Sequence, residues 1–143
     1  MIRFARLLFF AALAIASPVY GVSDEEVNAH KVAFDVAGAF SNDGFKLRDG
    51  NCSGSIRAKQ GIFVQVNLYA GNQYWFCAGA TEKAKKLLVT VFDENGQPVE
   101  SEPYQDGAKA AAGFSPTSSG AYIIRIEEVE GDPASYCLLY CYK

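Results

Sequence analysis

Histidine is nearly absent from this chain of 143 residues, since His30 is the only one. The sequence also contains no Cys-x-x-Cys pair, no glycine-rich phosphate-binding loop and no Gly-x-Ser-x-Gly nucleophile motif. Zinc sites usually combine closely spaced cysteine and histidine ligands, and covalent catalysis needs a nucleophile beside a base. We therefore expect a non-enzymatic protein without a metal or cofactor, and we interpret His30 as a structural residue.

An excess of basic residues is absent as well. The chain has 13 lysines and arginines against 16 aspartates and glutamates, giving a formal charge of −3. Nucleic-acid binding needs a basic surface that neutralises phosphates, so we expect no nucleic-acid partner. Asp93–Gly96 ("DENG") has its glycine too early for a calcium loop. Glu127, Glu128, Glu130 and Asp132 could form a weak calcium site, but we interpret them as a solvated acidic strand end.

A long apolar run occurs only near the N-terminus, where Leu7–Ala16 follows Arg3 and Arg6. About ten apolar residues are too few to span a membrane, and a basic start before a short apolar core is typical of a secretory signal peptide. We expect cleavage after Gly21, with Ala16 as the alternative. The predicted organisation is a signal peptide at 1–21, a helix and connector at 22–50 and a β-domain at 51–143, located in the periplasm or outside the cell without a membrane span.

Four cysteines, Cys52, Cys77, Cys137 and Cys141, remain after the predicted cleavage. An even number in an exported chain predicts two disulfides. Cys137 and Cys141 would lie roughly 13 Å apart in a regular strand, beyond the limit of about 7 Å between bridged Cα atoms. Each should therefore pair with Cys52 or Cys77. We favour Cys77 with Cys137 and Cys52 with Cys141, and the other arrangement stays open.

Ser23 and Glu26 form a capping box before apolar residues at spacings of three and four, which predicts one amphipathic helix from Asp24 to Phe40. Short alternating runs then follow, including 62–69 and 73–78, and Asn95-Gly96 is the strongest hairpin signal. The pattern predicts an all-β fold: an antiparallel β-sandwich or jelly roll of seven to eight strands, with the helix packed on it.

Alternation in the last strand divides its side chains between two faces. One face carries Tyr136, Leu138, Tyr140 and Tyr142, and the other carries Cys137, Leu139 and Cys141. We assign the aromatic face to the core, so an apolar outer face that includes Trp75 needs a cover. We expect Val27 and Phe34 of the helix to pack there. In the competing interpretation, Trp75 is an exposed aromatic platform that binds a ligand.

Four segments, "VNLYAGNQYWFCAG", "LLVTVFDENGQPV", "GFSPTSSGAYIIRI" and "YCLLYCYK", resemble the bacterial pre-peptidase C-terminal (PPC-like) β-sandwich. The shared features are an aromatic strand after a glycine turn, an aliphatic strand ending near Asp and Gly, and an "sG-x-Y" strand start. The resemblance covers about Ile62 to Tyr142. It implies a secreted, non-catalytic module that binds a glycan, a matrix component or another envelope protein.

The "SGAY" tetrapeptide, Ser119 to Tyr122, also resembles the "SG-x-Y" loop of periplasmic lysozyme inhibitors, which are small exported β-proteins. That resemblance implies that Ser119, Gly120 and Tyr122 face the catalytic carboxylates of a lysozyme or another hydrolase. The alternation Tyr122, Ile124, Ile126 instead predicts that Tyr122 belongs to the core. The exposure of Tyr122 therefore bears directly on this interpretation.

Overall fold

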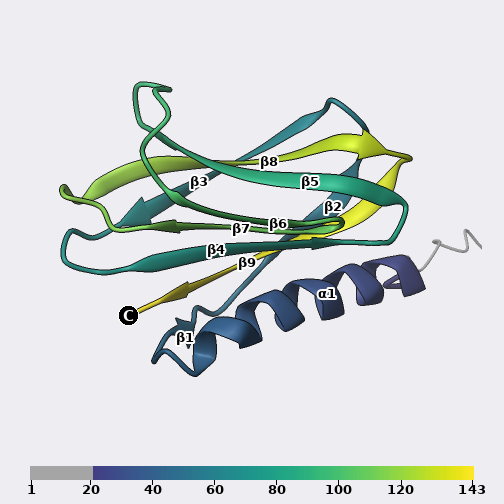
Figure 1. The fold of residues 1–143 in the computed structure, drawn as a ribbon, viewed down its shortest axis with the longest axis horizontal. Coiled ribbons are helices and arrows are strands. Elements are labelled where there is room, and N and C mark those ends of the chain that lie inside the picture. The colour runs from purple at the N-terminus through teal and green to yellow at the C-terminus, as the bar shows by residue number, and fades with distance from the viewer. Residues whose placement is uncertain (1–20) are drawn as a thin grey trace, which may run out of the picture.

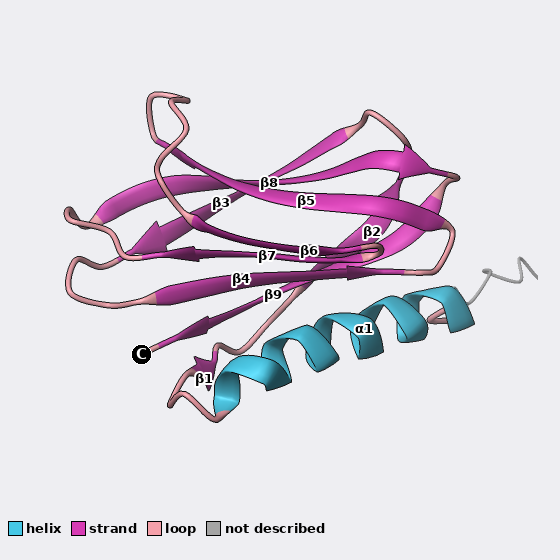
Figure 2. Cartoon of the chain, viewed as in Figure 1, coloured by secondary structure: helices cyan, strands magenta, loops and turns pink. Residues whose placement is uncertain are grey.

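The computed structural model describes residues 21–143. The preceding segment, which carries the predicted signal peptide, lies outside the described residues. Within residues 21–143, no helix is long and apolar enough to cross a membrane. The described chain forms one helix and two antiparallel sheets that pack face to face (Figures 1 and 2). The predicted sandwich with an N-terminal helix is confirmed.

Helix α1 (Asp24–Ser41) begins where the capping box predicts, and both of its hydrogen bonds are present between Ser23 and Glu26. Its buried face consists of Ala29, Ala33, Val36 and Ala37. Val27 and Phe34 are 56% and 48% exposed, so the prediction that they pack on the sheet is wrong. Small side chains let the helix backbone approach the sheet closely, and this turns the larger side chains outward.

The larger sheet contains six strands in the order β1-β9-β4-β7-β6, with β2 also paired to β9. Its strands are β1 (Lys46–Leu47), β2 (Cys52–Ile56), β4 (Tyr74–Ala80), β6 (Glu102–Asp106), β7 (Lys109–Phe114) and β9 (Ala134–Tyr142). The smaller sheet has the order β3-β8-β5, formed by β3 (Gly61–Leu68), β5 (Ala84–Asp93) and β8 (Gly120–Gly131). The described residues thus form nine strands, whereas the sequence pattern predicts seven to eight. The pattern does not reveal the two-residue β1 and the short β2, because neither has a clear alternation.

The predicted Asn95-Gly96 hairpin is only partly formed. Val99 N donates to Val91 O, and Phe92 forms an isolated bridge with Pro98. Beyond Val99 the chain leaves the smaller sheet and joins the larger one as β6. The two arms of the turn therefore connect the two sheets at one end of the sandwich.

Two apolar layers hold the molecule together. The first lies between the sheets and includes Phe76, Ile124 and Leu138. The second lies between α1 and the outer face of the larger sheet and includes Cys137, Leu139 and Cys141. The predicted division of the last strand is confirmed for its buried residues, and α1 covers the outer face of β4 and β9 (Figure 1).

Candidate functional site

Three loops meet at one end of the sandwich, drawn at the left of Figure 1: 69–73 between β3 and β4, 94–101 between β5 and β6, and 115–119 between β7 and β8. The backbone N–H of Ala70 donates to Ser119 Oγ at 2.8 Å, which joins the first loop to the third. The second and third loops line a common hollow of about 250 Å³, with Asn95 on one side and Ser118 on the other.

The β7–β8 loop and the first residue of β8 present Ser118, Ser119 and Gly120 to solvent, whereas Tyr122 is only 8% exposed. The Tyr122 hydroxyl donates to the Ser118 carbonyl oxygen at 2.7 Å. Its ring meets Phe114 edge-on, with centroids 5.2 Å apart. Tyr122 is thus a core residue, as the alternation predicts, and the interpretation in which it faces a partner enzyme is corrected: Tyr122 holds the loop from below.

Hydrogen bonds also order the other two loops. Tyr74 is buried, and its hydroxyl accepts from Tyr69 N at 2.9 Å and from the Asn72 side chain at 3.2 Å. Asp93 Oδ1 accepts from Asn95 N and Gln97 N, both at 2.9 Å. The sequence indicated these turns through the break between the runs 62–69 and 73–78 and through Asn95-Gly96. No local pattern indicated that they would meet the Ser119 loop. All three loops are therefore held in defined conformations.

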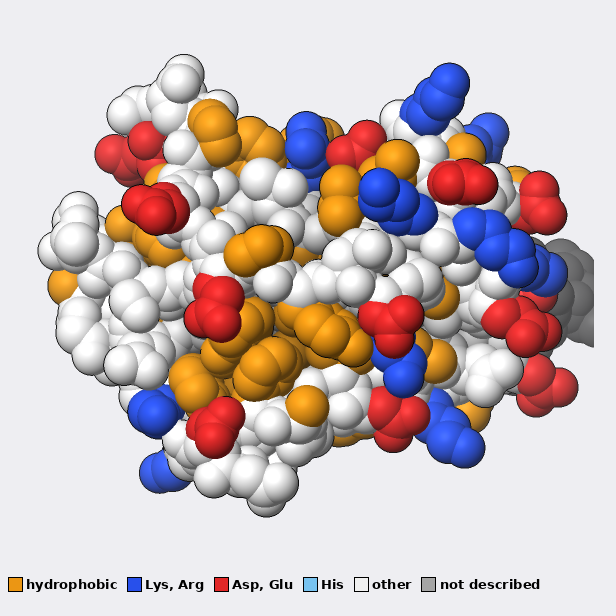
Figure 3. All heavy atoms as spheres, in the orientation of Figure 1, with side chains coloured by type: hydrophobic (Ala, Val, Ile, Leu, Met, Phe, Trp, Pro, Cys, Tyr) orange, Lys and Arg blue, Asp and Glu red, His pale blue; other side chains and the backbone are white. Residues whose placement is uncertain are grey.

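The charge at this end is acidic. Asp93 and Glu94 line the hollow beside Ser118, and Asp93 and Glu100 line a second hollow of about 560 Å³ on the other side of Tyr122. Within residues 21–143, no lysine or arginine lines either hollow. On the face drawn in Figure 3, acidic side chains flank the β5–β6 loop, and most of the basic side chains gather toward the opposite end. A partner at this end would meet a negative potential.

Trp75 does not form an open aromatic platform. Its ring stacks on Phe40 of α1, with centroids 4.1 Å apart and an angle of 11° between the ring planes. On the neighbouring strand, a Cβ at Gly113 would come within 2.8 Å of the same indole. Because the helix covers the ring, a ligand cannot stack on that face, and the cover predicted for the outer face is the arrangement observed.

All four cysteines are free thiols in the structure, so it contains neither of the two predicted disulfides, including the favoured bond between Cys77 and Cys137. Cys52 lies opposite Leu138 and packs in the layer between the sheets, whereas Cys141 lies in the layer under α1. The favoured pairing of Cys52 with Cys141 is therefore wrong, because the two side chains point to opposite faces of the larger sheet. The sequence could not reveal this, since it does not specify which residue of β9 faces Cys52.

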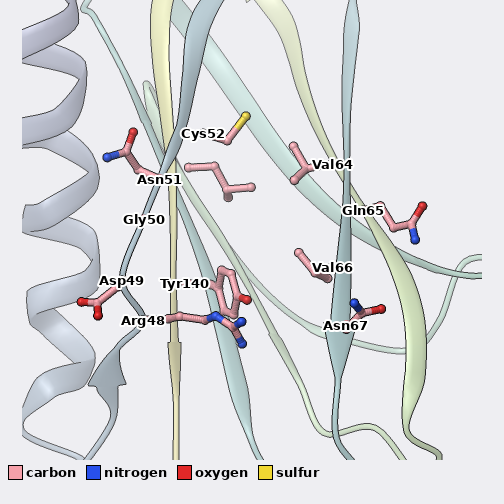
Figure 4. Close-up of a pocket in the computed structure, with 11 residues that line it drawn as sticks. Arg48, Asp49, Gly50, Asn51, Cys52, Val64, Gln65, Val66, Asn67 and Tyr140 are labelled. Atoms are coloured by element: carbon pink, nitrogen blue, oxygen red, sulfur yellow. The ribbon is translucent and has the colours of Figure 1, made fainter.

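A separate hollow of about 320 Å³ lies at the open edge between the sheets, beside β2, β3 and β9 (Figure 4). Val64 and Val66 point into it, and the Arg48 guanidinium lies 5.4 Å from the centre of the Tyr140 ring at one end. Burial raises the pKa of Tyr140 more than the Arg48 charge lowers it, so its hydroxyl stays protonated at neutral pH. No sequence pattern indicated this hollow, because Arg48 lies in an irregular connector.

The remaining residues singled out in the sequence form no chemical centre. His30 is half-buried on α1, as expected for a structural residue. Glu128 is fully buried, which corrects its interpretation as part of a solvated strand end, and burial and then Asp132 raise its pKa. In the part of the chain that the structure describes, no three His, Cys, Asp or Glu side chains are grouped so as to hold a metal ion.

No protein-family model matches the chain, and no curated protein matches it in sequence. One solved structure of similar shape is that of PliG from Aeromonas hydrophila, a periplasmic lysozyme inhibitor of g-type lysozyme. The TM-score is 0.48, the sequences are 16% identical, and the match covers 66% of this chain and 85% of PliG. This likeness assigns neither a family nor an activity to the chain.

Proposed function

We propose that this protein is an exported, non-enzymatic inhibitor of a lysozyme or another glycan hydrolase, acting in the periplasm or outside the cell. The surface that binds the enzyme is the three-loop end, with Ser118, Ser119 and Gly120 entering the substrate cleft. The observation that carries the proposal is the state of this loop. It is exposed at its tip, yet it is fixed at both sides by the Tyr122 hydroxyl and the Ala70 amide.

A fixed loop suits inhibition because ordering a flexible loop on binding costs free energy. A loop that is already ordered in the free protein avoids this cost. The exposed groups of Ser118 and Ser119 are small and polar, so they fit a narrow cleft and can form hydrogen bonds with carboxylates. Gly120 adds no side chain, and a Cβ there would meet no atom within 4 Å, so the surface beside the loop is open to a partner. The "SG-x-Y" resemblance supports the same surface, with Tyr122 as its internal support.

The acidic hollows beside the loop favour an enzyme with a basic rim around its cleft. Complementary charge mainly raises the association rate, and salt screens it. Inhibition by this protein should therefore weaken as ionic strength rises, through slower association. An enzyme with an acidic rim should be a poor target.

The test is an inhibition curve for the mature chain against a panel of lysozymes, starting with a g-type lysozyme. Ser118→Trp places a bulky ring at the loop tip and leaves the Ser118 carbonyl that Tyr122 holds. We expect it to raise the half-inhibitory concentration at least about tenfold, because a misfitting side chain at an interface costs more than about 1.4 kcal/mol. The matched control is Ser53→Trp, at an exposed position in β2. Its inhibition should equal that of the wild type.

Two results would count against the proposal. If the wild type inhibits no glycan hydrolase in the panel, the function is wrong. If Ser118→Trp and Ser53→Trp both inhibit like the wild type, the inhibitor acts through another surface. Thermal melting of both variants shows whether each is folded, so that loss of inhibition is not confused with unfolding.

The hollow beside Arg48 favours a second candidate, a binding module for a small glycan or another polar ligand. Its volume of about 320 Å³ is at the lower end of the range for ligand pockets, about 300 to 1,000 Å³. It combines an apolar wall of Val64, Val66 and Leu138 with polar lining residues and the Arg48 cation at its end. Calorimetry with soluble peptidoglycan fragments tests this function. Binding that Arg48→Ala abolishes, together with unchanged hydrolase activity, would favour the module over the inhibitor.

A further inference from the structure

Three thiols lie together beneath helix α1. Cys77 and Cys137 are 0% exposed and Cys141 is 3% exposed, and all three belong to the apolar layer between the helix and the larger sheet. The proposed inhibitory surface does not use them. Cys77 lies on β4, and the other two cysteines lie on the paired strand β9, so Cys77 could form a disulfide with either of them.

The register of β4 and β9 gives the position of Cys77 relative to the two cysteines of β9. Cys77 lies directly opposite Leu139, so Cys137 and Cys141 are its two diagonal neighbours on the same face. Side chains at diagonal positions can reach one another in an antiparallel pair, and the twist of the strands makes the two diagonals unequal. The direction in which the Cys77 sulfur leans then decides between them.

The Cys77 sulfur leans toward Cys141. Its Sγ lies 3.9 Å from the carbonyl oxygen of Trp75, and Trp75 is the residue directly opposite Cys141. The neighbouring Cys141 thiol, followed by burial, raises the pKa of Cys77. The Cys77 thiol in turn lowers the pKa of Cys141. Burial raises the pKa of Cys137 to about 11, so this third thiol stays protonated while α1 covers it.

We propose that Cys77 and Cys141 are a redox pair that closes to a disulfide between β4 and β9 beneath α1, leaving Cys52 and Cys137 as thiols. The oxidant is an external disulfide, such as oxidised glutathione or the disulfide of a thiol oxidase. The Cys141 thiolate attacks one of its sulfurs and expels the other as a thiolate. The Cys77 thiolate then attacks the Cys141 sulfur of this mixed disulfide, which forms the new bond and expels the second thiolate.

This exchange balances. The two cysteine thiols lose two protons and two electrons, and the external disulfide becomes two thiols. Because the pair is buried, the reaction takes place while α1 is away from the sheet, during folding or local opening. Once formed, the disulfide closes a loop of the chain from Cys77 in β4 to Cys141 in β9. Strands β5 to β8 lie between them in the sequence, so the β5–β6 and β7–β8 loops belong to this closed segment. The inference holds whether or not the protein is an inhibitor.

The experiment starts with the reduced chain unfolded in urea and refolds it in a mixture of reduced and oxidised glutathione. Free thiols are blocked with iodoacetamide, and the intact mass and a non-reducing peptide map are recorded. We expect two alkylated residues, Cys52 and Cys137, and one peptide linking Cys77 to Cys141. Four alkylated cysteines would overturn the proposal, and so would a link that contains Cys52 or Cys137.

Variants add a second readout. Cys137→Ala, the matched control, should keep the link and should melt at a lower temperature when dithiothreitol is added. Cys77→Ala and Cys141→Ala should lose both the link and the effect of dithiothreitol. If any of the three fails to fold, the peptide map of the wild type still decides the outcome.

Discussion

Gly79 fixes how closely helix α1 packs on the sheet, and replacing it with alanine tests this packing directly. A Cβ at this position would lie 2.3 Å from the backbone N of Ala33 and 2.7 Å from the carbonyl C of Val32. Ordinary contacts between carbon atoms are about 3.5 to 4.0 Å, so the helix would have to move away by about 1 Å. No rotamer change relieves the clash, because both contacts are with backbone atoms.

Overpacking of a well-packed core costs about 1 to 3 kcal/mol. Gly79→Ala should be at the upper end of this range, since moving the helix also weakens the contacts of Ala29 and Val36. We expect the free energy of unfolding to fall by about 3 kcal/mol in urea titrations followed by circular dichroism. In the reduced protein, the Cys137 thiol should also react faster with a labelling reagent, because the helix that covers it is displaced.

The matched control is Gly38→Ala. A Cβ at Gly38 would meet no atom within 4 Å, and alanine favours a helix interior over glycine by about 1 kcal/mol. This variant should be more stable than the wild type and should label at the wild-type rate. If Gly79→Ala were as stable as the wild type, the close approach of helix and sheet would not be what excludes a side chain there, and the reasoning would be wrong.

Two further predictions concern single side chains. Tyr122→Phe removes the hydrogen bond to Ser118 and keeps the ring, so stability should fall by about 1 kcal/mol and inhibition should weaken, whereas Tyr142→Phe, which has no hydrogen bond among the described residues, should change neither. Glu128 is buried without a hydrogen-bond partner and has a raised pKa, so the folded state holds its proton to higher pH than the unfolded state does. Stability of the wild type should therefore be lost as pH rises from about 4.3 through the pKa of the folded state, and Glu128→Gln should be more stable by about 1 to 3 kcal/mol at neutral pH. Equal stability of Glu128→Gln and the wild type across pH 4 to 8, measured by urea unfolding, would contradict this.

Sequence patterns correctly predicted the features that depend only on residues close together in the chain. Ser23 and Glu26 are three residues apart, and their two hydrogen bonds need only the first helical turn, so the start of α1 could be predicted from the sequence. The faces of β9 followed from alternation, because successive side chains of a strand point to opposite sides. Both features are set by backbone geometry alone.

The candidate site could be predicted only in part. Ser119 and Gly120 stand where the tetrapeptide indicated a loop, and they are exposed. The contact between Ala70 and Ser119 joins segments 49 residues apart, and no local pattern encodes it. For Trp75, the sequence left two interpretations open, and the stacking on Phe40 decided between them.

Periodicity along the chain accounts for one capped helix, short alternating strands and two faces for each strand. The tertiary structure selects which of these faces meet. It placed the alanines of α1 rather than Phe34 against the sheet, put Cys52 and Cys141 on opposite faces, and turned Tyr122 inward beneath an exposed Ser118. The physical reason is that direction follows from backbone dihedrals of adjacent residues, whereas contact depends on the register and packing of strands that are distant in the chain.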